Sequence, residues 1–447
     1  MRVTFVALLL LLLVAPQPPH RGVAAWAPSS TGTIPPAANL NRPGQGFLYG
    51  RVTTFDGSTH LGRLRFGRDE EAFWGDYFNG VKQQNPWRGH AEAIGLVQKR
   101  RSFSIFGFEI PFGTDSVDLR RPFMARFGDI ARIEAQGRDL RVTLKSGTGF
   151  DIKWGGANDL DDGVRVWDDK KGIVDLSHWA GGLPPASRVR IRTIELLPTP
   201  SLVAPPPRLH GTVRTPHGTF SGFIQWNRLS GVATDELAGQ STEGLVRVRF
   251  DTIRAIERRS GDSSFVILSD GRRIVLSGTR DVGDGSLGIY VDDRRYGRVL
   301  VSWDAFERID FSLADNSGPA YMDFPQGSPL MGTVTTRAGQ RLTGRLVYDL
   351  DESETTETLD APSRGVDYTI PFGLVSSVEP AGAGAARASV TLRNGEALEL
   401  ERAGDLGAAN AGLLVFVEGR KRPEYVPWAE IVRVDFDRPT GDGRKAF

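Results

Sequence analysis

Cysteine is absent from this 447-residue chain, and its absence removes several classes of protein at once. Without cysteine there is no disulfide framework, no thiolate metal site and no lipid-modified cysteine anchor. Histidine occurs only six times, with no HExxH pair and no close cluster, so the sequence predicts no zinc site. The lack of disulfides does not identify a compartment, because exported proteins without cysteine are common.

An excess of charge of either sign is also missing. The chain has 55 Lys and Arg against 54 Asp and Glu, a net charge of +1. If Arg2 and Arg21 leave with an export signal, the mature chain has a net charge near −1, since +1 − 2 = −1. A protein that binds a phosphate backbone needs a basic face. We therefore expect no nucleic-acid partner.

Only one long apolar run is present, and it lies at the N-terminus. Arg2 precedes the run Val3 to Ala15, and small residues follow at Ala25 and Ala27. These features predict a signal peptide over residues 1–27 and a linker over 28–47. A bilayer span needs about 20 residues, so we expect a periplasmic or secreted protein with no membrane span after signal removal. An uncleaved N-terminal anchor is the alternative.

The rest of the chain carries a repeat of one small β unit. A valine stands five residues before a glycine six times, and a hydrophobic triplet with a spacing of three follows each pair. The pairs are Val52/Gly57, Val142/Gly147, Val213/Gly218, Val266/Gly271, Val334/Gly339 and Val390/Gly395. The triplets start at Phe127, Arg188, Phe250, Trp303, Phe372 and Trp428. Repetition at this period has to be recognised before any fold is assigned.

The six units alternate between two kinds, which indicates that the true repeat is a pair. Odd units have threonine three residues before the glycine and even units have leucine there, as at Thr336 and Leu392. Residues with alternating polarity on both sides of each glycine favour β-hairpins. We expect a strand to end near each triplet aromatic, followed by a bend and a short closing strand; a one-turn helix at the bend is the alternative.

These patterns predict an all-β fold of six related units of about 60 residues, arranged as three double modules on Pro-rich linkers. The expected modules are 48–197 (module 1), 209–312 (module 2) and 330–437 (module 3), with linkers at 198–208 and 313–329 and a tail at 438–447.

The hairpin with a closing strand resembles the small barrels of Sm-like and SH3-like proteins. The resemblance rests on stretches such as Val390 to Gly395 and Val426 to Ile431. It implies a small-barrel fold for each unit. The RNA-contacting motifs of Sm-like proteins are not recognisable, so the resemblance carries no function.

Module 1 departs from the repeat because it contains an aromatic insertion, which we place at residues 75–122, and a shorter one before Arg188. Long loops on a repeated scaffold are often functional, and clustered aromatic side chains suit contacts with sugars or with a protein groove. The candidate ligand-binding residues are Trp74, Tyr77, Phe78, Trp87, Trp167 and Trp179. The alternative is that these side chains only extend the core of the module as an extra hairpin and helix.

An aspartate after the hairpin recurs in the even units, at Asp159, Asp281 and Asp405. Around Asp159 the acidic residues suggest a calcium loop, but their spacing fails the EF-hand pattern. We therefore expect a turn in which the aspartate bonds the backbone, and no metal. No nucleophile elbow, phosphate-binding loop or dinucleotide fingerprint is present, so we expect no cofactor and no catalytic residue.

The sequence thus favours an exported, non-catalytic repeat protein that acts as a binding or scaffold module in the cell envelope, with a protein or a cell-wall polysaccharide as its partner. The alternative is a carbohydrate-binding protein or glycoside-active enzyme with a cleft in module 1, where Glu71 or Asp76 would supply carboxylates. The oligomeric state does not follow from the sequence.

Overall fold

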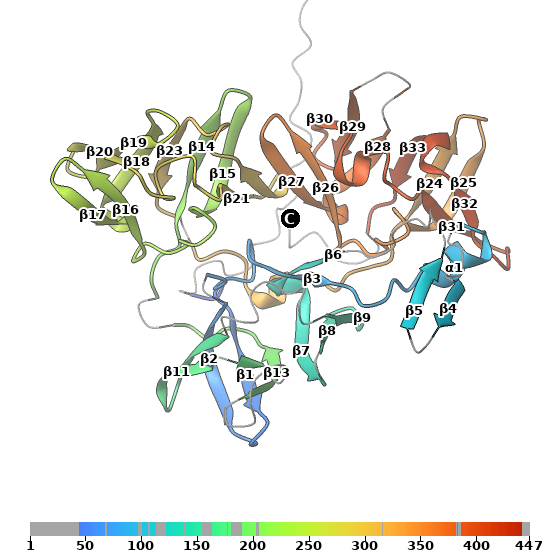
Figure 1. Cartoon of the computed structure of the whole chain (residues 1–447), viewed down its shortest axis with the longest axis horizontal. Coiled ribbons are helices and arrows are strands. Elements are labelled where there is room, and N and C mark those ends of the chain that lie inside the picture. The colour runs from blue at the N-terminus through green and yellow to red at the C-terminus, as the bar shows by residue number, and fades with distance from the viewer. Residues whose placement is uncertain are drawn as a thin grey trace, which may run out of the picture. The chain divides into compact units, whose positions relative to one another are not determined.

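A computed structural model gives the fold for most of the chain (Figure 1). It describes residues 44–67, 69–96, 101–105, 108–112, 122–137, 139–153, 163–176, 178–179, 190–202, 205–314, 316–380, 382 and 386–439. The signal peptide over 1–27, most of the 28–47 linker and the end of the tail lie outside these residues, and so does the Asp159 loop. Nearly all regular structure is strand, so the all-β prediction is confirmed.

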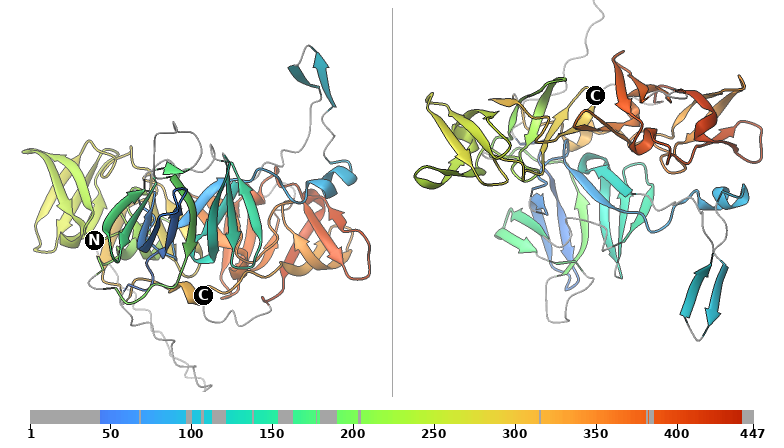
Figure 2. Two further views of the ribbon diagram at one scale, coloured as in Figure 1. Left: turned by 90° about the horizontal axis from the view of Figure 1, so that it is seen from below. Right: turned by 45° about the horizontal axis from the view of Figure 1, so that its top comes forward.

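Three sheets contain most of the strands. The module 1 sheet consists of β1 (Tyr49–Thr54), β2 (Thr59–Phe66), β7 (Ile130–Gln136), β8 (Asp139–Leu144), β9 (Gly149–Ile152), β10 (Val164–Asp168), β11 (Gly172–Leu176), β12 (His178–Trp179) and β13 (Arg190–Leu196). The strands β3 (Tyr77–Val81) and β6 (Pro122–Arg126) form a separate hairpin. Between them lie α1 (Arg88–Ala93) and a second hairpin of β4 (Arg101–Ile105) and β5 (Phe108–Phe112), visible in Figure 2.

Modules 2 and 3 supply the other two sheets. Module 2 contains β14 (His210–Thr215), β15 (Gly218–Gln225), β16 (Glu236–Ser241), β17 (Gly244–Arg249), β18 (Ile253–Arg258), β19 (Ser263–Leu268), β20 (Arg273–Ser277), β21 (Ile289–Asp293), β22 (Gly297–Val301) and β23 (Arg308–Ser312). Module 3 contains β24 (Met331–Thr336), β25 (Arg341–Val347), β26 (Thr358–Ser363), β27 (Val366–Pro371), β28 (Val375–Glu379), β29 (Arg387–Leu392), β30 (Ala397–Glu401), β31 (Leu413–Val417), β32 (Glu424–Val426) and β33 (Ile431–Phe436).

The same succession of eight strands occurs in all three sheets. The orders are β11-β10-β2-β1-β13-β7-β8-β9 in module 1, β22-β21-β15-β14-β23-β18-β19-β20 in module 2 and β32-β31-β25-β24-β33-β28-β29-β30 in module 3. A buried row of four residues crosses the middle of each sheet. The rows are Val52–Ile194–Ile133–Val142, Val213–Ile309–Ile256–Val266 and Val334–Val434–Val378–Val390. All six repeat valines therefore lie in the core.

The register shows that the two halves of each module exchange their first hairpins. In module 2, β14 and β15 come before β16 in the chain but pair with β23 and β21, which come from the second half. In return, β19 and β20 pair with β18 and β16 of the first half. Each half of the module is thus completed by strands from the other half.

The bend before the closing strand is a one-turn 3-10 helix at four of the five triplets whose first residue the structure describes. These turns are η1 (Phe127–Asp129), η3 (Phe250–Thr252), η5 (Phe372–Leu374) and η7 (Trp428–Glu430). Two further turns, η4 (Tyr321–Asp323) and η6 (Gly404–Leu406), lie elsewhere. The alternative of a helical turn is therefore the one found. It buries the first triplet residue and lets the following strand start at the second one, as with Phe250 and Ile253.

The module 2 sheet continues into β27 and β26 of module 3, because β22 pairs with β27 in an antiparallel ladder from Arg298↔Thr369 to Val301↔Val366. The 313–329 segment, which we expected to be a plain linker, packs on module 1. The Tyr321 hydroxyl donates to the Ile130 carbonyl at 2.8 Å, and Tyr321 and Phe324 belong to the module 1 core. Among the described residues, no helix is long and apolar enough to cross a membrane.

Candidate functional site

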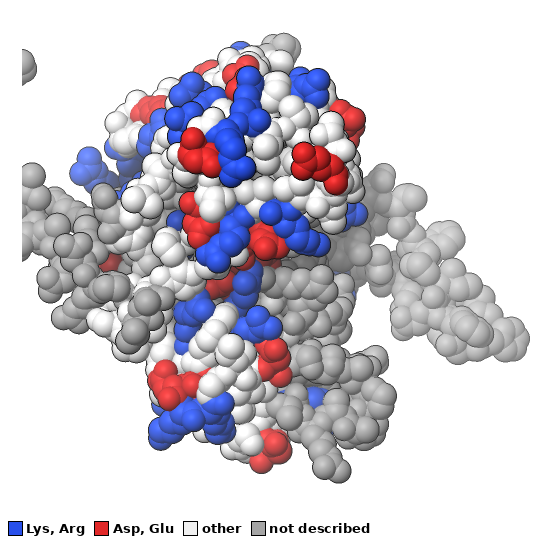
Figure 3. Space-filling model, turned by 90° about the vertical axis from the view of Figure 1, so that its left-hand side faces the viewer, with Lys and Arg blue, Asp and Glu red and all other residues white. Residues whose placement is uncertain are grey.

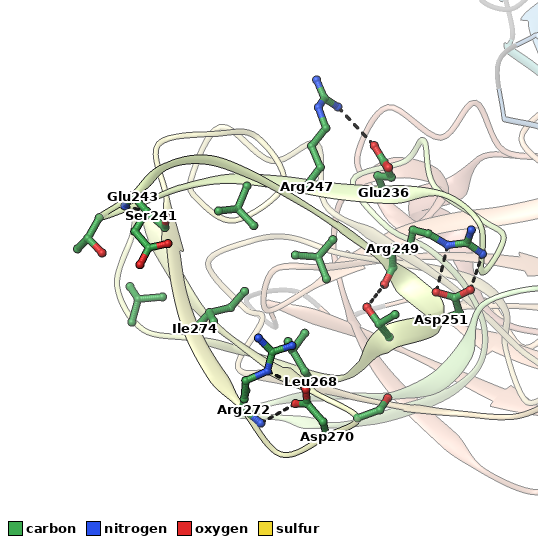
Figure 4. A pocket seen from close by; sticks show the side chains of 16 residues that line it. Glu236, Ser241, Glu243, Arg247, Arg249, Asp251, Leu268, Asp270, Arg272 and Ile274 are labelled. Atoms are coloured by element: carbon green, nitrogen blue, oxygen red, sulfur yellow. Dashed lines mark hydrogen bonds and ion pairs between the residues drawn. The ribbon is translucent and has the colours of Figure 1, made fainter.

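A groove lies on module 2, between β16, β17, β19 and β20. Its volume is about 1130 Å³. Val246 and Val248 of β17 line it, with Leu268 and Ile274 from the hairpin of β19 and β20. Figure 4 shows this group from close by. We call it the module 2 groove.

The groove exists because small side chains occupy positions that larger ones fill in the other modules. Val246 lies opposite Gly239 on β16, where Phe123 lies opposite Gly80 and Tyr368 lies opposite Ala361. In module 1, Phe123 packs on Phe150 with ring centroids 4.9 Å apart. In module 3, Tyr368 packs on Phe220 and Tyr296 of module 2, with centroids 6.0 and 5.6 Å apart. The two equivalent sites are therefore occupied, and the one on module 2 is open.

Each of the three arginines around the groove is paired with an acidic residue of the groove. Arg249 contacts Asp251 at 2.5 Å and Arg272 contacts Asp270 at 2.7 Å. Arg247 faces Glu236 at 3.8 Å, which is a weaker contact. Figure 3 shows basic and acidic side chains interspersed over this face, with no field of one sign. An apolar floor with a mixed rim of three arginines and four acidic residues suits a polypeptide better than a phosphate backbone.

One wall of the groove is the strand β17, and its outer edge is open. Among the described residues β17 pairs only with β16. Leu245 is 54% exposed, although its neighbours Val246 and Val248 are half-buried. An exposed edge of six residues without proline presents unpaired backbone N–H and C=O groups, which can take up another strand. The equivalent strand β27 is already paired in this way with β22.

A second cavity of about 360 Å³ lies where the β3·β6 hairpin meets modules 2 and 3. Carboxylates from module 3 line it, at Asp349, Asp351, Glu352, Glu357, Asp360 and Asp405. Lys82 enters from β3 and pairs with Asp351 at 2.9 Å and Glu357 at 3.1 Å. Burial lowers the pKa of Lys82, but these carboxylates outweigh it and hold the pKa above its ordinary value. We interpret this cavity as a structural junction.

The predicted site residues of β3 and the preceding loop lie in the core. Trp74, Tyr77 and Phe78 are at most 3% exposed. Phe78 packs on Phe66 and Phe127, with centroids 5.7 and 6.5 Å apart. The Tyr77 ring lies 4.7 Å from the Arg298 guanidinium of module 2. These side chains hold module 1 together and fix it to module 2, and none of them lines either cavity.

The other predicted residues are separated from one another. Trp87 precedes α1 and packs on Phe416 of module 3, with centroids 5.8 Å apart. Trp167 on β10 lies under the Arg63 guanidinium, 3.6 Å from its carbon. Trp179 is in β12, but its side chain lies outside the described ones. The structure does not bring the side chains of Trp87 and Trp167 together with Trp74 into one site.

The carboxylates considered for sugar chemistry are both engaged in ion pairs. Glu71 contacts Arg63 at 2.7 Å and Arg65 at 3.1 Å. Asp76 accepts the backbone N–H groups of Glu71 and Ala72 and faces Arg298 at 3.5 Å. Both are buried, at 5% exposure each. They cannot converge on a glycosidic bond in this arrangement.

The two recurring aspartates that the structure describes, Asp281 and Asp405, accept hydrogen bonds from the backbone of a neighbouring strand. Asp281 accepts the N–H of Ala238 on β16 at 2.8 Å, and Asp405 accepts the N–H of the equivalent Asp360 on β26 at 2.6 Å. Each ties the second half of its module to the third strand of the first half. Within the part of the chain that the structure describes, no group of three or more His, Asp or Glu side chains could hold a metal ion.

The module 2 groove was not predicted from the sequence, although a signal for it is present there. Alignment of the units on Phe127, Phe250 and Phe372 places Phe123, Val246 and Tyr368 at one position. The valine in place of an aromatic residue at this position indicates the groove in module 2. Comparisons of the chain with protein-family models, with curated proteins and with solved structures found no match.

Proposed function

We propose that this chain is an exported, non-catalytic repeat protein that binds another protein and acts as a binding or scaffold module in the cell envelope. The observation that carries the proposal is the module 2 groove with the open edge of β17 beside it. An extended segment of a partner would pair its backbone with β17 and place alternate side chains over Val246 and Val248. Export rests on the N-terminal leader of the sequence.

We further propose that the chain consists of six related small-barrel units in three double modules. The identical strand orders and the three buried rows support this arrangement. Each double module would hold two SH3-like barrels, which exchange their first hairpins. Such a pair shares one core, so a module of about 100 residues buries enough surface to be stable where a single unit is marginal.

A polypeptide fits the site better than a cell-wall polysaccharide. Free backbone groups on a strand edge are matched by another strand, since both present amides at the same spacing. Sugar sites depend on exposed aromatic faces and unpaired polar groups, and the groove is lined by aliphatic side chains and self-paired ions. We therefore do not favour the carbohydrate alternative.

The test uses Val246→Tyr, which restores the aromatic residue found in the other two modules and fills the groove. A matched control is Val432→Tyr, at an exposed position on β33. Each chain is used for capture from an envelope extract and for cosedimentation with isolated cell-wall polymer. We expect protein ligands to be retained by the wild type and the control but lost by Val246→Tyr. Equal retention by all three, or polymer binding that Val246→Tyr does not weaken, would contradict the proposal.

A further inference from the structure

Two different outer strands, β22 and β27, pair where modules 2 and 3 meet. Strands equivalent to each of them occur elsewhere in the chain with an unpaired outer edge. In the contact, β22 is the outer strand after β21, and β27 is the outer strand after β26. The strand equivalent to β27 in module 2 is β17. The strands equivalent to β22 are β11 in module 1 and β32 in module 3. Among the described residues, β11, β17 and β32 each have one neighbouring strand.

Of the two spare edges equivalent to β22, only β11 is suited to pairing. The strand β32 has three residues, and Pro423 immediately before it lacks a backbone N–H. Short edges with proline are a common protection against strand addition. By contrast, β11 has five residues without proline and leaves Ile173 64% exposed. An exposed isoleucine on an unprotected edge is unusual unless another strand covers it.

We infer that β11 of one copy of this chain pairs with β17 of a second copy and repeats the pairing of β22 with β27. This inference rests on the proposed function and names a second copy as the partner strand at the same site. Within one chain β11 and β17 belong to different sheets, so the pairing joins two molecules. Each copy has one well-suited edge of each kind, because β6, the module 1 equivalent of β17, also pairs with a single strand but begins at Pro122 and is mostly buried. The contact is therefore head-to-tail and can continue from copy to copy.

The side chains match when the β22·β27 register is transferred. Val174 then lies opposite Val246, and both are half-buried in the isolated chain. On the other face Ile173 lies opposite Arg247, and Asp175 lies opposite Leu245. The diagonal neighbours are therefore Ile173 with Leu245 and Asp175 with Arg247, an apolar pair and a pair of opposite charge.

The contact between copies should be weaker than the one inside the chain. In the chain, Phe220 and Tyr296 cover Tyr368 beside the β22·β27 ladder. The equivalent positions beside β11 are His60 and Lys171, which bury less apolar surface. Association should therefore depend on concentration.

The test is sedimentation of the full chain over a range of concentrations. Leu245→Asp places a carboxylate opposite Asp175 of the other copy, and Ile173→Arg places a cation opposite Arg247. Both positions are exposed, so neither change should alter the thermal unfolding of the chain. Leu313→Asp, at a residue that is 90% exposed outside the two strands, is the control.

We expect the wild type and the control to grow beyond dimers, and each single variant to remain a monomer. An equimolar mixture of the two variants should give a dimer, because one copy keeps an intact β11 and the other an intact β17. A monomeric wild type, unchanged association of either variant, or a monomeric mixture would overturn the inference. If the wild type is monomeric while Val246→Tyr still abolishes protein capture, this inference fails and the proposed function stands.

Discussion

Val213, in the first half of module 2, lies directly opposite Ile309, the last triplet residue of the second half. Both side chains are fully buried. The equivalent pairs are Val52 with Ile194 and Val334 with Val434. A repeat valine in each module is therefore covered by the closing strand of the other half, and neither half contains its own complete core.

This exchange predicts that a single unit does not fold. A fragment of residues 209–258 lacks the partners of β14 and β15, which are β23 and β21. We expect it to be unfolded, whereas a fragment of residues 205–314 should unfold cooperatively. Circular dichroism during thermal denaturation measures both. A monomeric 209–258 fragment with a cooperative transition would show that the units are independent barrels.

Lys82 is expected to be a major contributor to the contact between modules 1 and 3. Its side chain is 4% exposed, and its ammonium group is held by Asp351 and Glu357. Lys82→Met keeps the aliphatic stem but leaves two buried carboxylates without a cation, which should cost about 3–5 kcal/mol. Urea denaturation measures the loss. Lys421→Met, at an exposed lysine, is the control; an equal effect of both changes would contradict the assigned role.

The junction cavity predicts a stability that falls as pH rises. Loss of solvent, with Asp351, Asp405 and Asp349 nearby and only Lys82 opposing them, raises the pKa of Glu352 well above its ordinary value. Because the folded-state pKa is the higher one, this stabilisation is complete below the unfolded pKa of about 4. It is lost as pH rises through the folded-state pKa.

Glu352→Gln should therefore keep the thermal midpoint higher than in the wild type as pH increases from about 4 to about 8. The matched control is Glu418→Gln, at an exposed glutamate. Midpoints measured across this range give the comparison. A wild-type midpoint that rises with pH, together with no flattening in Glu352→Gln, would show that the carboxyl is not protonated in the folded chain.

One glycine on the second strand of each module should respond to substitution in the same way. An added Cβ would lie 1.9, 2.1 and 2.1 Å from a backbone carbonyl oxygen at Gly62, Gly222 and Gly344. The strand that follows in the sheet approaches too closely for a side chain, so each change to alanine should cost about 1–3 kcal/mol or more. Gly231→Ala has open space and is the control. Denaturant midpoints would contradict the equivalence of the modules if only one glycine were sensitive.

The sequence was sufficient for the fold class and for the positions of the core. The repeat valines and the later triplet residues are buried in every module. It could not predict the exchange of hairpins, because Val213 has the same spacing to Gly218 whichever closing strand covers it. The pairing of β22 with β27 could not be predicted either, since it depends on how two modules meet and not on any local sequence pattern.

The candidate site was harder to predict for a physical reason. Trp74, Tyr77 and Phe78 form an aromatic cluster in the sequence, and aromatic clusters occur both in binding sites and in cores. Their burial in the structure follows from contacts with Phe127 and with Arg298 of the next module, which lie far away in the chain. The module 2 groove is marked only by Val246, and a valine in a strand is too common to indicate a binding site.

The most direct test of the account is amide hydrogen exchange on β17 and β27 in the dilute full chain. The account predicts fast exchange for the outward-facing amides of residues 244–249, because no strand covers that edge. The equivalent amides of residues 366–369 should be protected by β22. Equal protection of the two strands under dilute conditions would show that the β17 edge is closed. That result would contradict the proposed binding surface.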